Sequence, residues 1–115
     1  MSEFLVFIPV YNEEHSIRSV INEIKNIADY VDVLIIDDGS TDDTPNILEK
    51  TENIQLVRHS QNQGYGKTLI DGFRYANEKA YKYVITIDSD KQHQPREISL
   101  FFEKAKEGPW DIISG

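Results

Sequence analysis

Short apolar runs alternate with amphipathic stretches along this chain. Four runs rich in β-branched or aromatic residues predict strands, and they cover residues 4–8, 31–36, 54–57 and 83–87. Three of the four are nearly continuous in apolar character, as expected for strands that are buried on both faces of a parallel sheet. A fifth and shorter run covers residues 111–113.

Between these runs, apolar residues recur at the spacing of a helix with one buried stripe. Thr44 followed by Pro45 predicts the start of a further short helix that extends through Lys50, and Pro95 marks the first turn of the last helix. The apolar stripes of the other helices cover residues 17–27, 69–80 and 98–105.

Strands and helices therefore alternate from one end of the chain to the other. Such alternation is typical of an α/β fold with a Rossmann-like, open and mostly parallel sheet, flanked by helices and connected by right-handed crossovers. With 115 residues and neither an internal repeat nor a linker, the chain is predicted to form a single domain over residues 1–115.

Composition and charge narrow the possible functions. Hydrophobic residues make up 39% and charged residues 28%, which is typical of an ordinary globular protein. The net charge of -8 argues against a nucleic acid partner, and the lack of cysteine excludes disulfides and thiolate ligands. We see no signal peptide and no apolar run of about 20 residues. A cytoplasmic location is expected, with membrane contact only through regions outside this chain.

Acidic residues follow three of the predicted strands. In open α/β sheets, ligands bind beyond the carboxyl ends of the strands, which meet at one edge. We therefore expect these three loops to converge on a ligand site. They contain Glu13 and Glu14 after the first strand, Asp37, Asp38 and Asp42 after the second, and Asp88 and Asp90 after the fourth.

Asp88 and Asp90 are candidate ligands of a divalent cation, Mg²⁺ or Mn²⁺. Two carboxylates two residues apart at a strand exit can reach one hard cation, whose remaining positions take diphosphate oxygens. The cation would also offset the repulsion between acidic loops and a nucleotide diphosphate. An isolated Asp-x-Asp more often caps a turn, but its position after a buried strand and beside two other acidic loops favours the metal site.

The first two loops supply candidate nucleotide contacts. Asp38 is predicted to accept hydrogen bonds from a ribose or base, whereas Asp37 is assigned to the turn itself. In the first loop, Pro9 stiffens the strand exit, Tyr11 offers a flat face to a base, and Glu13 offers an acceptor to an exocyclic donor. Together these residues predict a nucleotide site next to the metal site.

Residues 63–68 look like a P-loop but lack its first glycine, because position 61 is glutamine. A glycine-rich approach to a helix N-terminus still favours an anion, so Lys67 is a candidate phosphate contact. A flexible turn capped by Thr68 is the alternative interpretation.

The three histidines carry less information. His15 and His59 are predicted to be surface loop residues. His93 lies next to the predicted metal motif, but a lone histidine there is more often a surface residue than a ligand contact.

Five motifs, taken in order, resemble glycosyltransferase family 2, whose members use nucleotide sugars on a GT-A fold. The closest resemblance is to the dolichol-phosphate and polyprenyl-phosphate sugar transferases. It spans nearly the whole chain and implies that the chain is the N-terminal, nucleotide-sugar-binding portion of such an enzyme. The motifs are PVYNEE at 9–14, IIDDGSTDDT at 35–44, NQGYGKT at 62–68, IDSDKQHQP at 87–95 and DIISG at 111–115.

The resemblance implies transfer of a sugar with inversion, from a GDP- or UDP-linked donor to a lipid phosphate or a saccharide. A catalytic base would lie downstream of this chain, so the isolated chain is expected to bind donor weakly and to be nearly inactive. The resemblance assigns nucleotide contacts to Pro9, Tyr11, Glu13, the backbone of Ile36 and the side chain of Asp38, metal and diphosphate contacts to Asp88, Ser89 and Asp90, and a contact near the sugar phosphate to Gln92.

Three alternatives remain open. Asp88 and Asp90 could be the nucleophile and acid of a haloacid-dehalogenase-like phosphatase, although that pair normally follows the first strand. Asp37 and Asp38 could be the acidic pair of a phosphoacceptor receiver domain, although that pair also belongs after the first strand. The chain could also be a non-catalytic nucleotide-binding module.

Overall fold

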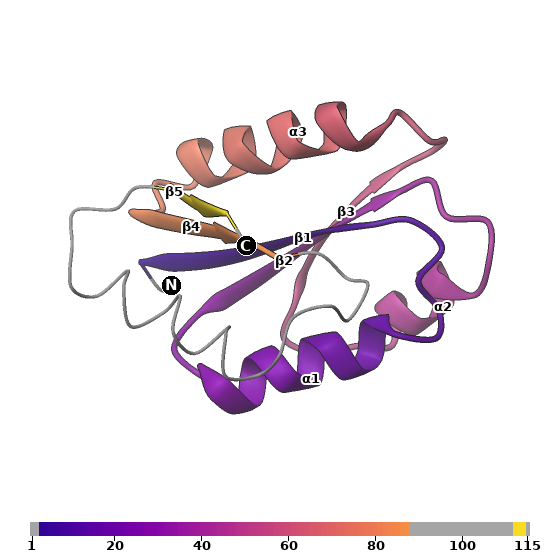
Figure 1. Ribbon diagram of the computed structural model, residues 1–115, viewed down its shortest axis with the longest axis horizontal. Helices are drawn as coiled ribbons and strands as arrows, with labels where there is room; N and C mark the ends of the chain where they lie inside the picture. The colour runs from indigo at the N-terminus through magenta and orange to yellow at the C-terminus, as the bar shows by residue number, and fades with distance from the viewer. Residues whose placement is uncertain (1–2, 88–111, 115) are drawn as a thin grey trace.

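The computed structural model describes residues 3–87 and 112–114 (Figure 1). Its strands are β1 (Phe4–Val10), β2 (Asp32–Asp38), β3 (Gln55–His59), β4 (Tyr83–Thr86) and β5 (Ile112–Ser114). Its helices are α1 (Ile17–Ile27), α2 (Thr44–Glu49) and α3 (Tyr65–Glu78). The helix predicted over residues 98–105 lies outside the described residues.

The strands form one sheet in the order β3-β2-β1-β4-β5, and every neighbouring pair is parallel. Helices α1 and α2 cover one face of the sheet and α3 covers the other (Figure 1). The α/β fold with an open parallel sheet is therefore confirmed. The order of the strands reverses at β1, which lies between β2 and β4, and such a switch point is where α/β sheets open a crevice for ligands.

The side chains of β1 alternate between two apolar clusters, one on each face of the sheet. Val6 and Ile8 pack in the cluster under α1 and α2, whereas Leu5 and Phe7 pack in the cluster under α3. All four are 0% exposed. Burial on both faces explains why the strand needs a continuous apolar run rather than an alternating one.

The strands extend further into polar sequence than the apolar pattern predicts. β2 continues through Asp37 and Asp38, and β3 continues to His59, because Asp37 pairs with Arg58 and Asp38 with His59 in the parallel ladder. The acidic residues predicted for the second loop thus begin inside a strand. None of the described helices is long and apolar enough to cross a membrane.

Candidate functional site

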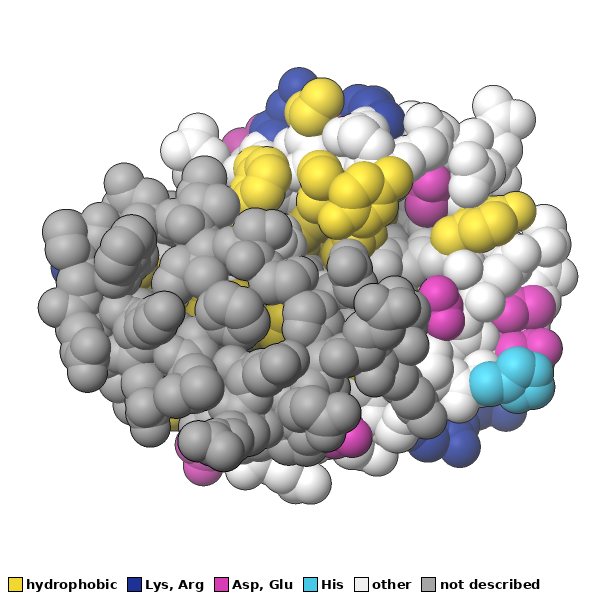
Figure 2. All heavy atoms as spheres, in the orientation of Figure 1, with side chains coloured by type: hydrophobic (Ala, Val, Ile, Leu, Met, Phe, Trp, Pro, Cys, Tyr) yellow, Lys and Arg dark blue, Asp and Glu magenta, His cyan; other side chains and the backbone are white. Residues whose placement is uncertain are grey.

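The carboxyl ends of β1, β2 and β4 meet at one edge of the sheet. Val10 pairs with Asp37, and the amide of Ile87, just after β4, donates to the carbonyl of Phe7 at 3.1 Å. Figure 2 shows acidic side chains gathered at the right-hand end, over the loops that follow β1 and β2. The next residues along the chain include Asp88, Ser89, Asp90 and Gln92, which lie outside the described residues.

The loops that follow β1 and β2 are joined by hydrogen bonds. The Asn12 amide donates to Ser40 Oγ at 2.9 Å, and the Thr41 amide donates to Asn12 Oδ1 at 2.8 Å. The Glu13 amide donates to Thr44 Oγ1 at 3.0 Å, which ties the first loop to the start of α2. The polar residues that look like loop sequence therefore fix the relative position of the two loops.

Asp37 shapes the turn that follows β2. Its Oδ1 accepts a hydrogen bond from the Ser40 amide at 3.1 Å, as expected from the turn role predicted for it, and its Oδ2 lies 3.5 Å from Arg58 Nε. Gly39 follows with a φ of +74°, and a Cβ there would lie 2.4 Å from the Asn62 amide nitrogen. Both the backbone angle and the close approach therefore require glycine at this position.

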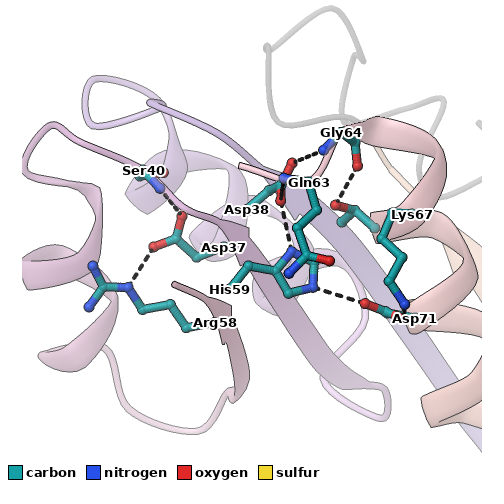
Figure 3. A network of polar contacts seen from close by, with 10 residues as sticks. Asp37, Asp38, Ser40, Arg58, His59, Gln63, Gly64, Lys67 and Asp71 are labelled. Carbon is teal, nitrogen blue, oxygen red and sulfur yellow. Dashed lines mark hydrogen bonds and ion pairs between the residues drawn. The ribbon is translucent and has the colours of Figure 1, made fainter. Parts of the chain in front are cut away.

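Asp38 holds the segment that leads into α3 (Figure 3). The residue is only 4% exposed. Its Oδ1 accepts from the Gln63 amide at 2.8 Å and lies 2.7 Å from His59 Nδ1, and its Oδ2 accepts from the Gly64 amide at 3.0 Å. Burial acts to raise the pKa of this carboxyl, but the hydrogen bonds from His59 and two amides outweigh it and lower the pKa.

His59 is buried, so the prediction that it is a surface loop residue is wrong. It is 8% exposed at the end of β3, and its Nε2 lies 2.9 Å from Asp71 Oδ2 in α3. The hydrogen bond with Asp38 raises the pKa of His59, burial opposes this, and the contact with Asp71 adds to the rise. No local signal marks this burial, because the apolar run ends at Val57 and only the pairing of Asp38 with His59 in the ladder extends the strand to His59.

The predicted phosphate contact Lys67 is paired within the protein. Its Nζ lies 2.9 Å from Asp71 Oδ1, one turn further along α3. Thr68 Oγ1 donates to the Gly64 carbonyl at 2.9 Å, so this hydroxyl bonds back to a carbonyl and does not cap the free amides of the first turn. His15, by contrast, has a side chain that is 96% exposed, which confirms its surface position.

The remaining predicted nucleotide contacts line the same edge of the sheet. Pro9 and Ile36 are partners in the β1–β2 ladder, and Tyr11 is 45% exposed just beyond β1. The Glu13 carboxylate accepts from Ser16 Oγ at 2.9 Å. Apart from Gln92 and the Asp88–Asp90 motif, the structure therefore brings the predicted residues to one region, and their contact with a nucleotide stays a prediction.

Comparison with known proteins decides the family. Residues 5–115 match the family model described as Glycosyl transferase family 2. The chain belongs to this family. It is 32% identical over 117 residues to the UDP-N-acetylglucosamine–dolichyl-phosphate N-acetylglucosaminyltransferase of Methanococcus voltae, a match that covers 86% of this chain and 46% of the relative. The chain thus spans about half the length of the curated relatives it matches.

Solved structures of glycosyltransferases confirm the GT-A fold. Residues 1–349 of S. aureus TarS match with a TM-score of 0.71 and 25% identity, over 93% of this chain and 33% of that fragment. The mannosyltransferase PcManGT of Pyrobaculum calidifontis, solved with GDP-Man and Mn²⁺, matches with a TM-score of 0.64 and 26% identity, over 76% of this chain and 27% of PcManGT. Predicted family and fold are therefore both correct.

Proposed function

We propose that this chain supplies the donor- and metal-binding part of an inverting glycosyltransferase. The donor would be a GDP- or UDP-linked sugar, and the acceptor a lipid phosphate or a saccharide. Membership of glycosyl transferase family 2 supports sugar transfer. The M. voltae relative, a UDP-N-acetylglucosamine–dolichyl-phosphate transferase, and the PcManGT complex with GDP-Man support a nucleotide-sugar donor, and the former supports a lipid-phosphate acceptor.

The observation that carries the proposal is the meeting of β1 and β4 at the switch point of the sheet. Ile87 is 1% exposed, and its amide donates a hydrogen bond to the carbonyl of Phe7 in the middle of this sheet. In the sequence it immediately precedes Asp88. The neighbouring exits of β1 and β2 carry polar residues suited to a nucleoside. A ligand crevice is expected at this point of an α/β sheet.

Asp88 and Asp90 would hold Mg²⁺ or Mn²⁺, since hard cations prefer carboxylate oxygens. When bound, the cation would stabilise the negative charge that develops on the departing diphosphate. The Mn²⁺ in the PcManGT complex supports this choice of cation. Among the described residues there is no cluster of three or more potential metal ligands.

Chain segments next to this metal site would hold the rest of the donor. The nucleoside would contact Asp38 and the β1 exit, and Ser89 and Gln92 would lie near the diphosphate. Lys67 could reach a phosphate only by leaving Asp71. We further propose that the catalytic base lies outside this chain and that the whole enzyme works at the cytoplasmic face of a membrane.

Titration calorimetry with UDP and with GDP, each with and without Mn²⁺, tests the proposal. We expect metal-dependent binding of one of them by the unmodified chain, and at least about tenfold weaker binding by Asp90→Ala. Asp29→Ala is the matched control, because Asp29 is exposed and precedes β2 at the opposite edge of the sheet.

Two outcomes would contradict the proposal. If the folded chain binds neither nucleotide in the presence of Mn²⁺, the donor site is wrong. If Asp90→Ala and Asp29→Ala bind equally well, the metal assignment is wrong. Formation of a phosphoenzyme with acetyl phosphate would instead favour the phosphatase or receiver alternatives.

A further inference from the structure

Four side chains of alternating charge form a continuous row between β2 and α3 (Figure 3). The row runs from Asp38 through the ring of His59 to Asp71 and ends at Lys67. The three contacts measure 2.7, 2.9 and 2.9 Å in that order. Asp38 and His59 are nearly inaccessible to solvent, so this row differs from a screened surface ion pair.

The geometry around His59 favours a proton on both ring nitrogens. Nδ1 faces a carboxylate oxygen of Asp38 and Nε2 faces a carboxylate oxygen of Asp71. An ionised carboxylate only accepts hydrogen bonds, and a neutral imidazole has only one N–H to donate. A neutral ring would therefore set a nitrogen lone pair against a carboxylate, whereas the imidazolium donates to both.

Groups of the protein occupy most of the positions at which the Asp38 carboxylate can accept a hydrogen bond. An ionised carboxylate offers about four lone-pair positions. Three are filled, by His59 Nδ1 and the Gln63 amide at Oδ1 and by the Gly64 amide at Oδ2. The carboxylate is thus held in one orientation, and the remaining position belongs to Oδ2.

We propose that His59, as an imidazolium shared between Asp38 and Asp71, is a positioning residue that orients the Asp38 carboxylate for the donor nucleoside. This inference rests on the proposed function. His59 does not itself touch the nucleotide. It links the end of β2 to α3, so the carboxylate and the segment from Gln63 to Gly64 keep one arrangement.

The charged groups around the His59 ring determine how the net charge of the row changes when His59 loses a proton. Among the described residues these are Asp38 from β2 and Asp71 and Lys67 from α3, while Arg58 pairs with Asp37 instead. With His59 protonated the row is neutral, and with His59 neutral it carries one net negative charge. Loss of the Nδ1 proton, which leaves the remaining N–H on Nε2 toward Asp71, sets the Nδ1 lone pair against Asp38 and loosens that carboxylate. Nucleotide binding should therefore weaken as His59 deprotonates.

Two neutral variants separate the two ring contacts. The amide nitrogen of asparagine is three bonds from Cα, as Nδ1 is, so His59→Asn keeps a donor toward Asp38 and loses the one toward Asp71. The amide nitrogen of glutamine is four bonds from Cα, as Nε2 is, so His59→Gln keeps the donor toward Asp71 instead. Neither variant titrates near neutral pH. His15→Asn is the matched control, since that side chain is exposed.

The measurement is the affinity for Mn²⁺ with UDP and with GDP, determined by calorimetry between pH 5.5 and 8.5 in steps of about half a unit. At the acid end, His59→Asn should bind like the unmodified chain, and His59→Gln should bind about tenfold more weakly. Toward the alkaline end, the unmodified chain and His15→Asn should lose about tenfold in affinity relative to His59→Asn. The ionisation of the nucleotide and of the hydrated metal ion also changes with pH. This change is the same for every variant, so it cancels in these ratios of affinity.

The proposal is overturned if His59→Asn and His59→Gln lose affinity equally, or if the ratio of the unmodified chain to His59→Asn is constant with pH. A second measurement uses only the unmodified chain, so it does not depend on whether a variant folds. Imidazole ¹⁵N shifts of the unmodified chain should show His59 doubly protonated at pH 6, and its titration must coincide with the change in affinity. Failure of the proposed function looks different, because then the unmodified chain and His15→Asn bind neither nucleotide at any pH, and the inference falls with it.

Discussion

Asp37 and Asp38 are adjacent in the sequence, but at the end of β2 their side chains enter different networks on opposite faces of the sheet. Asp37 has Arg58 and the turn amide of Ser40 as partners. Asp38 has His59 and the amides that precede α3. Because successive residues of a strand point to opposite faces, two identical carboxylates acquire different tasks.

The paired side chains predict how stability depends on pH. The pKa of His59 is raised above 6.5, so its contribution is complete below pH 6.5 and is lost as the pH rises through the folded-state value. The pKa values of Asp38 and Asp71 are lowered below 3.8, so their contributions are complete above pH 3.8 and are lost at more acid pH. Stability should therefore be highest between about pH 4 and 6.5.

Urea denaturation at a series of pH values measures this window. Between pH 6.5 and 9, the free energy of unfolding should fall by about 1.5–3 kcal/mol, the scale of one hydrogen bond to a charged group. The fall should disappear in His59→Asn and persist in His15→Asn. An unchanged slope in His59→Asn would show that other groups cause it.

At the scale of elements, α3 lies unusually close to the sheet at one point. A Cβ on Gly72 would lie 2.5 to 2.7 Å from three ring atoms of Phe7, a central β1 residue that is 0% exposed. The Phe7 ring also meets that of Phe73 at 6.3 Å between centroids. The glycine therefore sets the distance between helix and sheet, and with it the position of Asp71 one residue earlier.

Gly72→Ala should destabilise the fold by about 1–3 kcal/mol, because overpacking a closed core outweighs the better helix propensity of alanine. Gly66→Ala in the same helix is the control, since a Cβ there has no neighbour within 4 Å. That variant should be neutral or more stable by up to about 1 kcal/mol. Chemical denaturation compares the two, and equal effects would mean that helix propensity alone decides both.

At the scale of the whole molecule, the topology of the sheet places the apolar residues that stabilise the fold apart from the polar residues of the candidate site. Both faces are covered by helices and filled with apolar side chains, while the polar residues collect where the strands end. With a net charge of -8 and acidic loops at this edge, the nucleotide diphosphate of the proposed donor would need a cation to approach. Metal and nucleotide should therefore bind together or not at all.

Thermal unfolding tests this coupling. With Mn²⁺ present and the preferred nucleoside diphosphate at about 100 times its Kd, the folded state should gain about 2.7 kcal/mol, which raises Tm by several degrees. Excess EDTA should abolish the shift. Mn²⁺ with the corresponding nucleoside, which lacks the diphosphate, should give none. A full shift in EDTA would show that the nucleotide binds without metal.

Most of the fold could be predicted from the sequence, because buried parallel strands and amphipathic helices leave distinct periodicities. The five strands and the three described helices lie where those patterns predict them. The ends of the strands could not be predicted as well. β2 and β3 continue into polar residues because each is held by a ladder partner, and pairing between distant segments leaves no local signal.

The candidate site was only partly predictable for the same reason. The meeting of the first two acidic loops follows from the rule that parallel strands end at one edge, while the third loop lies outside the described residues. His59 was missed because the apolar run that predicts this strand ends at Val57, which leaves His59 in the following loop, whereas the strand itself extends to His59. Its burial comes from α3, whose Asp71 is 12 residues further along the chain.

The sequence by itself determined the α/β class, the family and the set of polar residues at the strand ends, since these follow from local periodicity and motif order. Only the tertiary structure decided which of those residues are already engaged by the protein. Asp38 turned out to be fixed by His59 and two amides, and Asp71, the i+4 neighbour of Lys67 in α3, to be shared with His59. The contacts of His59 with Asp38 and Asp71 depend on distances between separate elements, which packing sets and no local pattern encodes.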